Sequence, residues 1–435
     1  MSTRAGSLKV MTTENRRRKF TAFIGALVIT TPALFLRVSG THLDDIPAAV
    51  VFGLGIVGAA FLLTWAAEAL ELDVSRGLAI GVLALIAVLP EYAVDFTFAY
   101  KAGNNLDYAP LALANMTGSN RLLIGIGWPL VVFIGAWKLR KIARRQDYSG
   151  PIDTEVKLAR PQAIEIVILA MATIYSLSLP LKNHITPYDA VILIGLYFFY
   201  VTRIWRAPAG EPELEGPAQL LGELSKSARR LSVAGLLVYS GLIIWFCAEP
   251  FAEALISTGE ATGISTFLLV QWVAPLATES PELLVAGLFA YRLKSSAGLG
   301  VLVSSKVNQW TLLVGCLPLV FIIAGGAMSG LPIDVRQREE LFLTAAQSAF
   351  AVAILMNRSL SVKEAWWLLG LFLSQFVLGV ILPPSLAEWE RIGVGIFYLV
   401  LAGGVLINQR RFLGPILRDG LRTPAGEMIG SDERN

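Results

Sequence analysis

Apolar residues in this chain come in long runs, and the polar segments that separate the runs are mostly short. A run of about 18 to 25 apolar residues has the length of an α-helix that crosses a lipid bilayer. The runs lack the strict alternation of apolar and polar residues that is typical of a half-buried strand. The pattern predicts an all-α polytopic membrane protein with about 12 spans, which begin near Phe20, Ala48, Gly77, Ala109, Gln162, Tyr188, Leu231, Ile264, Ala297, Leu341, Trp366 and Arg391.

The composition agrees with this class. Hydrophobic residues make up 55% of the chain and charged residues 16%, and the mean hydropathy is +0.62. Nothing in the composition indicates a nucleic-acid partner. Both cysteines, Cys247 and Cys316, lie inside apolar runs, so we expect small core residues rather than a disulfide.

The distribution of Lys and Arg predicts the orientation, because basic residues in short loops stay on the cytoplasmic side. One side holds nearly all of the basic loop residues, and the other side holds only Lys101, Lys182, Arg336 and Arg338. The first span follows the basic run 16–19 and lacks a convincing small-residue cleavage site, which predicts a retained anchor. We therefore expect both termini in the cytoplasm and the protein in a prokaryotic inner or plasma membrane.

Two apolar segments contain a helix-breaking proline followed by a carboxylate, in Leu89-Pro90-Glu91 and Ser280-Pro281-Glu282. In each half an asparagine lies in the next apolar segment, at Asn120 and at Asn308. Ionisable residues inside the membrane are costly and usually functional. Their recurrence in two halves of one chain predicts a paired ion site.

The two copies are expected to have opposite orientations, because five spans separate the third from the eighth. This predicts an inverted repeat of five plus five spans, with one extra span at each end and broken helices at the membrane midplane. The predicted organisation is a basic tail (1–19), an extra helix (20–45), a first half (46–206, motif about 64–133), a linker (207–230), a second half (231–384, motif about 248–321), an extra helix (385–409) and a tail (410–435).

Proline has no backbone N–H to donate, so carbonyls near Ile86 and Ala277 lose helical partners and become available as ligands. Two antiparallel broken helices would bring Glu91 and Glu282 together as metal ligands. The amide oxygens of both repeat asparagines would complete an all-oxygen shell that suits Ca²⁺. The alternative is a proline kink whose carboxylate has no function.

The Pro-Glu pairs, Gly118-Ser119-Asn120 in the following span and the inverted second copy resemble the alpha repeats of the cation/Ca²⁺ exchanger superfamily. The likeness covers about a third of the chain and implies a ten-span core that works by alternating access. It also implies that Glu91 and Glu282 are the Ca²⁺ ligands, with Asn120 and Asn308 lining the site.

The chain departs from that family at several polar positions. Asp95 and Glu279 are additional acids, and Arg121 and Lys306 are additional bases. Because unpaired charges near the midplane are costly, we expect Asp95 to pair with Arg121 and Glu279 with Lys306. Alternatively, Lys306 faces away from Asn308, two residues further on, and snorkels or pairs elsewhere. Further polar residues expected to line the pathway are Asn115, Thr278, Ser304 and Thr311.

These features predict a secondary-active antiporter that exchanges a divalent cation, Ca²⁺, for H⁺. Sodium coupling (Na⁺/Ca²⁺ or Na⁺/H⁺ antiport) is the first alternative. It is less favoured, because Thr278 is the one hydroxyl that remains of those that precede the Pro-Glu motifs in the family. A cation channel and an intramembrane enzyme are the others, although the chain contains no H-E-x-x-H or G-x-S-x-G motif. The expected partners are inorganic cations and the bilayer, no cofactor is expected, and the oligomeric state stays open.

Overall fold

The computed structural model describes residues 13–70, 72–73, 88–148, 150–205, 214, 216–424 and 427–428. In this part of the chain, nine helical segments are long and apolar enough to cross a membrane. Helices also lie where the other spans were expected, although the start of the third expected span is outside the described residues. The all-α membrane class is confirmed, whereas the number of spans stays a prediction.

The elements of the first half and its flanks are α1 (Thr13–Ser39), α2 (Asp45–Leu70), α4 (Leu89–Asn104), η1 (Leu106–Tyr108), α5 (Ala109–Leu122), η2 (Leu123–Gly127), α6 (Trp128–Arg145), β1 (Val156–Lys157), η3 (Arg160–Gln162), α7 (Ala163–Ser176), η4 (Leu179–Leu181), β2 (His184–Ile185), α8 (Pro187–Trp205) and α9 (Ala218–Gly222). The second half and its flank contain α10 (Lys226–Thr262), α11 (Thr266–Tyr291), α12 (Ser295–Asn308), η5 (Gln309–Leu313), α13 (Val314–Ile323), β3 (Leu331–Pro332), α14 (Val335–Ile354), η6 (Leu355–Asn357), β4 (Ser359–Leu360), α15 (Val362–Ile381), α16 (Pro384–Asn408) and α17 (Arg410–Leu421).

Local sequence signals explain where several of these helices begin and end. Pro90 lies in the first turn of α4, where its missing N–H costs nothing. A capping box, in which Ser361 and Glu364 exchange side-chain and backbone hydrogen bonds, starts α15. Gly263 ends the long helix α10 in the left-handed conformation, with φ +72°.

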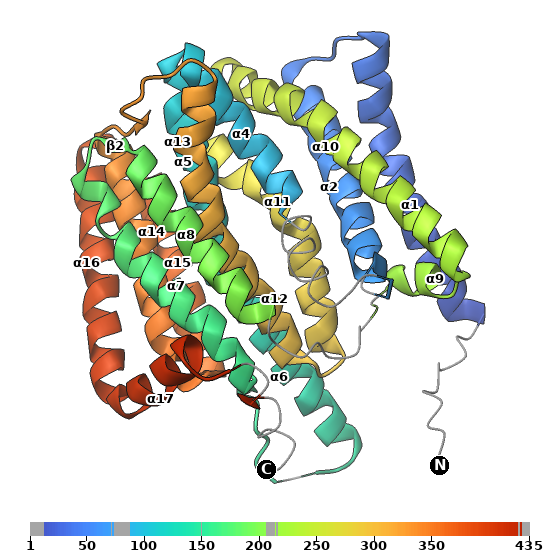
Figure 1. Ribbon diagram of the computed structural model, residues 1–435, viewed down its shortest axis with the longest axis vertical. Helices are drawn as coiled ribbons and strands as arrows, with labels where there is room; N and C mark the ends of the chain where they lie inside the picture. The colour runs from blue at the N-terminus through green and yellow to red at the C-terminus, as the bar shows by residue number, and fades with distance from the viewer. Residues whose placement is uncertain are drawn as a thin grey trace.

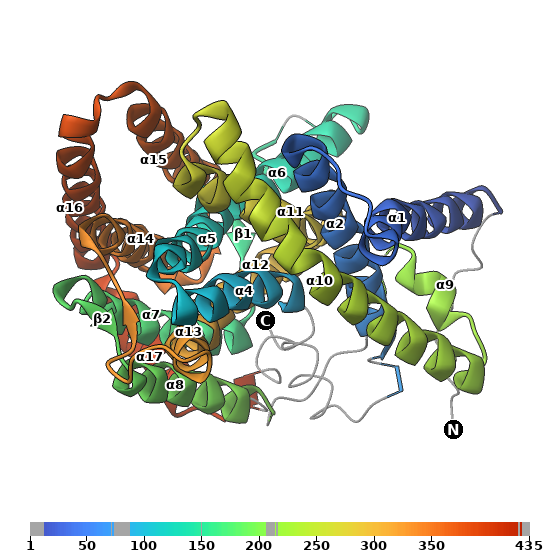
Figure 2. The same ribbon diagram turned by 90° about the horizontal axis from the view of Figure 1, so that it is seen from above.

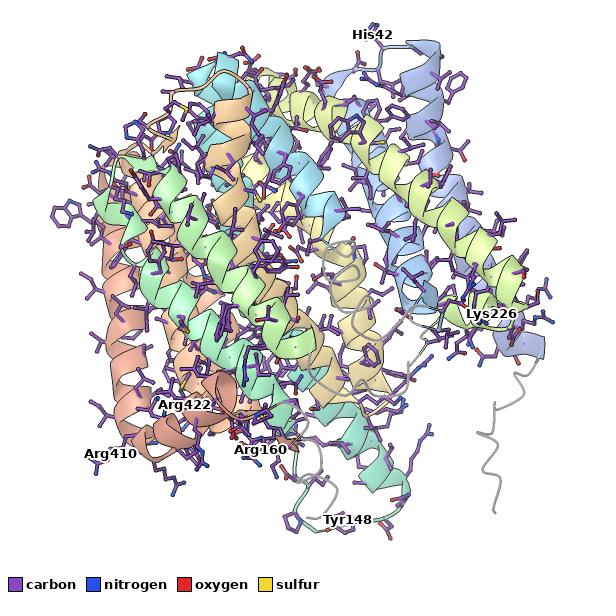
Figure 3. All side chains as sticks on the ribbon, in the orientation of Figure 1. His42, Tyr148, Arg160, Lys226, Arg410 and Arg422 are labelled. Carbon is purple, nitrogen blue, oxygen red and sulfur yellow. The ribbon has the colours of Figure 1, made fainter. Side chains whose placement is uncertain are left out.

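Two short β-ribbons reveal the symmetry of the fold. β1 pairs with β4, and β2 pairs with β3. β1 and β2 precede α7 and α8, and β3 and β4 precede α14 and α15. In the repeat, β1 therefore corresponds to β3 and β2 corresponds to β4. Exchange of the two halves converts the β1–β4 ribbon into the β2–β3 ribbon. β2 lies near the upper end of the bundle (Figure 1), and Arg160, close after β1 in the chain, is at the lower end (Figure 3). The ribbons are at opposite ends, as an inverted repeat requires.

Helix packing follows the same relation between the halves. α4 packs on α13 as α11 packs on α6, and α7 packs on α12 as α14 packs on α5. The extra helices are peripheral, since α1 packs on α2 and α16 on α14. Helices α4, α5, α11 and α12 lie in the middle of the bundle, between α1 on one side and α16 on the other (Figure 2). The motif-bearing helices therefore occupy the centre of the molecule.

The outer surface of the bundle is apolar, as expected for contact with lipid tails. Large exposed side chains include Ile174, Val191, Trp245, Ile323 and Val400. Polar residues gather at the ends: His42 is at one end, and Tyr148, Arg160, Arg410 and Arg422 are at the other (Figure 3). α1 begins and α17 lies at that second end (Figure 1).

Candidate cation site

The two repeat glutamates come from opposite halves and meet in the centre. Glu91 is in the first turn of α4 and is 4% exposed. Glu282 follows Pro281 inside α11. Their carboxylates are close enough to interact electrostatically. The structure brings these residues together, and their role as cation ligands stays a prediction.

Four carboxylates of this centre each have an oxygen atom without a hydrogen-bond partner among the described residues. These atoms are Glu91 Oε1, Asp95 Oδ2, Glu279 Oε2 and Glu282 Oε2. Glu279 also interacts electrostatically with both repeat glutamates. Buried carboxylate oxygens are normally hydrogen-bonded, so such a group of exceptions needs a chemical reason. Bound cations or protons would satisfy these atoms and neutralise the group.

Each repeat asparagine is held by a side chain from the other half. Lys306 Nζ donates to the backbone O of Asn120 at 2.9 Å and to its Oδ1 at 2.6 Å. Reciprocally, the Tyr92 hydroxyl donates to Asn308 Oδ1 at 3.0 Å. Both amide oxygens therefore already accept a hydrogen bond. Lys306 is buried and binds Asn120 of the other half, so its side chain finds a partner elsewhere than Asn308 and does not extend to the membrane surface.

Both expected ion pairs are absent from the described part of the chain. Asp95 Oδ1 accepts a hydrogen bond from Asn115 Nδ2 at 2.7 Å instead of pairing with Arg121. Glu279 Oε1 accepts from Gln309 Nε2 at 2.5 Å, while Lys306 reaches Asn120. Neutral amide groups close to each acid thus replace the bases as partners.

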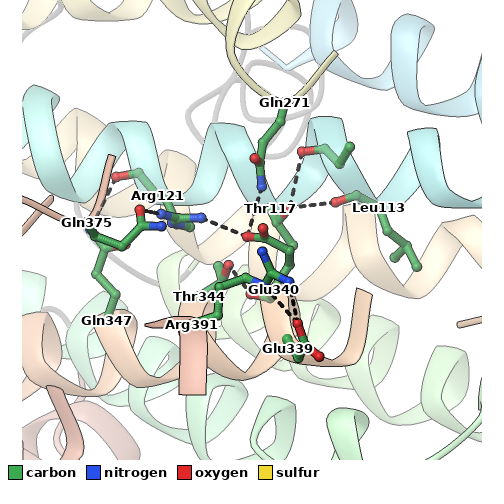
Figure 4. Close-up of polar contacts among 11 residues, drawn as sticks. Leu113, Thr117, Arg121, Gln271, Glu339, Glu340, Thr344, Gln347, Gln375 and Arg391 are labelled. Carbon is green, nitrogen blue, oxygen red and sulfur yellow. Dashed lines mark hydrogen bonds and ion pairs between the residues drawn. The ribbon is translucent and has the colours of Figure 1, made fainter. Parts of the chain in front are cut away.

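Arg121 lies instead in a polar cluster with Glu340 and Gln375 (Figure 4). Its Nη1 donates to Glu340 Oε2 at 2.8 Å, and its Nη2 donates to Gln375. Gln271 Nε2 donates to the same Glu340 oxygen at 3.0 Å. The guanidinium also lies 5.1 Å from the ring centre of Trp272. This cluster links α5 to α11, α14 and α15, and its ion pair is neutral as a unit.

Because Arg121 is bound to Glu340, its positive charge does not neutralise the carboxylates of the centre. Glu91, Asp95, Glu279 and Glu282 remain there with Lys306 as the one base contributed by the two motif copies. The sequence predicted four carboxylates with two bases in the centre. Four carboxylates with one ammonium carry one more negative formal charge. Bound protons or a divalent cation must therefore supply more of the neutralising charge.

The other candidate lining residues differ in how they bond. Thr278 and Thr311 donate to carbonyls of their own helices, at 3.3 Å to Ala274 and 2.6 Å to Val307. Ser304 shares a 2.5 Å hydrogen bond with Tyr200 of α8. Of the four candidates, Asn115 is the one that binds a carboxylate of the centre.

The proline-containing helices also differ from the expectation in detail. α11 continues as one helix through Pro275 and Pro281. The carbonyl of Ala277, expected to be free, accepts the Ser280 hydroxyl at 3.2 Å. A serine hydroxyl close to a proline is a common way to satisfy such a carbonyl in a membrane helix. Ile86 lies outside the described residues.

A π-helical turn follows each repeat asparagine. η2 spans Leu123–Gly127 after α5, and η5 spans Gln309–Leu313 after α12. Such wide turns often lie at functional sites. η5 positions Gln309 so that its amide reaches Glu279. Glycine and proline after each asparagine were visible in the sequence, but they do not by themselves predict a π-turn.

Sequence reasoning missed Tyr92, Gln309 and Glu340 as partners of the site residues. Tyr92 follows Glu91 directly, and Gln309 follows Asn308 directly, so their positions beside the motifs were an available signal. Glu340 lies at the beginning of the tenth expected span and 219 positions from Arg121, a separation that no local pattern bridges.

Comparison with known proteins agrees with this architecture. The family model described as "Sodium/calcium exchanger protein" matches residues 46–206 and 232–381. The chain therefore belongs to the sodium/calcium exchanger family and is an integral membrane protein of a transporter family. No curated protein matches the chain.

Several solved structures share the fold. A structure described as the H⁺/Ca²⁺ exchanger CAX is 40% identical, with a TM-score of 0.84 over 96% of this chain and 100% of that chain. Native YfkE is 16% identical, with a TM-score of 0.57 over 86% of this chain and 100% of that chain. The sodium-calcium exchanger NCX_Mj is 15% identical, with a TM-score of 0.50 over 78% of this chain and 98% of that chain. The last two similarities support the fold alone.

Proposed function

We propose that the protein is an antiporter that exchanges Ca²⁺ for H⁺ at one central site by alternating access. The observation that carries this proposal is the group of buried carboxylate oxygens without hydrogen-bond partners, contributed by both inverted halves. Oxygen ligands of this kind suit Ca²⁺, and the same atoms can bind protons instead. Competition of both ions for one set of carboxylates couples their movement in opposite directions.

Membership of a transporter family and the inverted symmetry favour transport over catalysis. A site made by two oppositely oriented halves can open in turn to each side of the membrane. The relative with 40% identity is itself described as an H⁺/Ca²⁺ exchanger. We therefore propose that the protein is not an enzyme and that no cofactor is needed besides the transported ions.

Proton coupling is favoured over sodium coupling by the bonding of Asn120. Its backbone and side-chain oxygens both accept hydrogen bonds from Lys306, and these are oxygens that could otherwise bind a Na⁺ ion. By contrast, several carboxylates of the centre have oxygens without hydrogen-bond partners, and these can bind protons.

We also propose that the end with Tyr148, Arg160 and Arg410 faces the cytoplasm of a prokaryotic cell. Basic residues are concentrated at cytoplasmic ends of membrane helices. Both termini would then be cytoplasmic, since α1 begins and α17 lies at this end (Figure 1).

Uptake of radioactive Ca²⁺ into proteoliposomes under an imposed pH gradient, in Na⁺-free buffer, tests the function. We expect uptake by the wild type and loss of uptake in Glu91→Gln and Glu282→Gln. Glu260→Gln is the matched control, because Glu260 is exposed near the end of α10. Uptake that needs Na⁺ and ignores the pH gradient would support sodium coupling instead. Ion flux without counter-movement would indicate a channel.

A further inference from the structure

Lys306 is a fully buried base in the centre of a membrane protein. Its exposed fraction is 0%, and its ammonium lies 5.2 Å from the ring centre of Trp310. The corresponding position of the first half is Gly118, which packs so tightly against α11 that an added Cβ would lie 1.8 Å from the Gln271 carbonyl oxygen. The lysine therefore breaks the symmetry between the two halves.

The contacts of this ammonium resemble those of a bound cation. Lys306 Nζ lies 2.9 Å from the backbone O and 2.6 Å from the Oδ1 of Asn120. A carbonyl and an amide oxygen are the neutral ligands that a hard metal cation takes in proteins. Among the described residues no carboxylate lies within ion-pair distance of Lys306, so the ammonium is held by neutral oxygens, as a coordinated ion would be.

The ammonium also contributes a charge to the anionic centre. Lys306 interacts electrostatically with Glu91 and Glu279. A lysine ammonium is a compact point charge on a flexible stem, and in a buried site it repels a second cation strongly at short range. A free monovalent cation at the Asn120 oxygens would have to displace this group.

We propose that the amine of Lys306, bound to both Asn120 oxygens, fills a monovalent-cation subsite beside the carboxylates, and that it thereby excludes Na⁺ from the transport cycle. Lys306 is then a residue that determines ion specificity. This inference rests on the proposed Ca²⁺/H⁺ exchange, because it explains why the counter-ion is H⁺.

Replacement of Lys306 by neutral residues tests the inference. Lys306→Met keeps much of the stem, and Lys306→Gln can still donate a hydrogen bond to Asn120. Lys363→Met is the matched control, because Lys363 is exposed at the start of α15. Two readouts are used: thermal stability of the purified protein in about 0.15 M NaCl against choline chloride, and inhibition by Na⁺ of Ca²⁺ uptake driven by a pH gradient.

We expect NaCl to stabilise Lys306→Met and Lys306→Gln but not the wild type or Lys363→Met. We also expect the Na⁺ concentration for half-maximal inhibition of uptake to fall by about tenfold or more in both Lys306 variants. If Lys306→Met does not fold, Lys306→Gln and the wild type decide the question.

Two results would overturn the inference. One is a folded Lys306 variant as indifferent to Na⁺ as the wild type. The other is a wild type that Na⁺ stabilises in competition with Ca²⁺. Failure of the proposed function is a separate result, because it appears as absence of pH-driven Ca²⁺ uptake by the wild type, whereas the stability readout needs no transport.

Discussion

Arg121 and Glu340 form the most deeply buried ion pair among those described, with side-chain exposures of 2% and 5%. Removal of one member of such a pair leaves an uncompensated charge, which costs about 3–5 kcal/mol. We expect Arg121→Met to lose a free energy of unfolding in this range, measured by denaturant titration in detergent. The double variant Arg121→Met, Glu340→Gln should recover most of the loss. Equal losses in the single and double variants would exclude a role of the charge.

Gly118 allows the close approach of α5 to α11. A Cβ at this position would lie 1.8 Å from the Gln271 carbonyl oxygen, so the two helices would have to separate. We expect Gly118→Ala to lower the melting temperature and abolish Ca²⁺ uptake. The control is Gly235→Ala in α10, where an added Cβ meets no atom within 4 Å. There, alanine should be neutral or stabilising by up to about 1 kcal/mol. An active and stable Gly118→Ala protein would contradict the packing argument.

The sequence showed which charged residues lie inside the membrane-spanning segments, but it did not show which residues they bond to. The two Pro-Glu motifs predicted that Glu91 and Glu282 lie close together, because a carboxylate in an apolar segment is conspicuous, and the structure brings the two residues together. The sequence hypothesis assigned Arg121 to Asp95, whereas its long side chain reaches Glu340 on a distant helix. Which way a long side chain extends depends on tertiary packing that hydropathy does not encode.

Helix α17 is held at the basic end of the bundle, where it packs on α7. Two guanidinium nitrogens of Arg160, Nε and Nη2, donate to the Asp419 carboxylate at 2.7 and 2.8 Å. This hydrogen-bonded guanidinium holds the pKa of Asp419 below its ordinary value. Because the pKa is lowered on folding, the stabilisation is complete above about pH 3.9, the usual aspartate pKa, and is lost as the pH falls through the folded-state pKa.

We therefore expect acid to release α17 before the rest of the bundle. Hydrogen exchange of the α17 amides, corrected for its intrinsic pH dependence, should show lower protection at acid pH in the wild type. Asp419→Asn should show the lower protection already at neutral pH. Asp153→Asn is the control, because Asp153 forms an exposed ion pair with Lys157 of β1. Unchanged protection of α17 in Asp419→Asn would show that this pair does not hold the helix.

Hydropathy predicted the positions of the long helices well, because a membrane span must be continuous and apolar. It predicted neither the π-turns η2 and η5 nor the short ribbons. A π-turn replaces the i→i+4 hydrogen bonds of an α-helix with i→i+5 bonds over a single turn, and the spacing of apolar residues does not reveal this change. The ribbons are two residues per strand and join segments from different halves, which no local pattern can indicate.

Because the two halves are inverted copies of one fold, the end of the molecule that faces the cytoplasm has to be determined by its own measurement. Tyr148 lies at the end with Arg160 and Arg410, and His42 lies at the opposite end (Figure 3). In a background without Cys247 and Cys316, we expect a membrane-impermeant maleimide to label His42→Cys on intact cells. Tyr148→Cys should be labelled only in inside-out vesicles. The reverse pattern would show that the basic end faces outward.

The convergence of both halves on one centre is the property on which the proposed exchange depends. Glu91 and Glu282 come from helices that the inverted repeat relates, and both have oxygens without hydrogen-bond partners in the described structure. Two helices that each supply part of one site cannot bind the ion independently. Loss of either carboxylate should therefore have the same effect on binding.

Calorimetric titration of the purified protein with Ca²⁺ measures this directly. The wild type should bind one Ca²⁺ per chain in the central site, with protons released on binding. Glu91→Gln and Glu282→Gln should each abolish that binding, while Glu260→Gln should retain it. Undiminished Ca²⁺ binding in either of the two central variants would contradict a site shared between the halves.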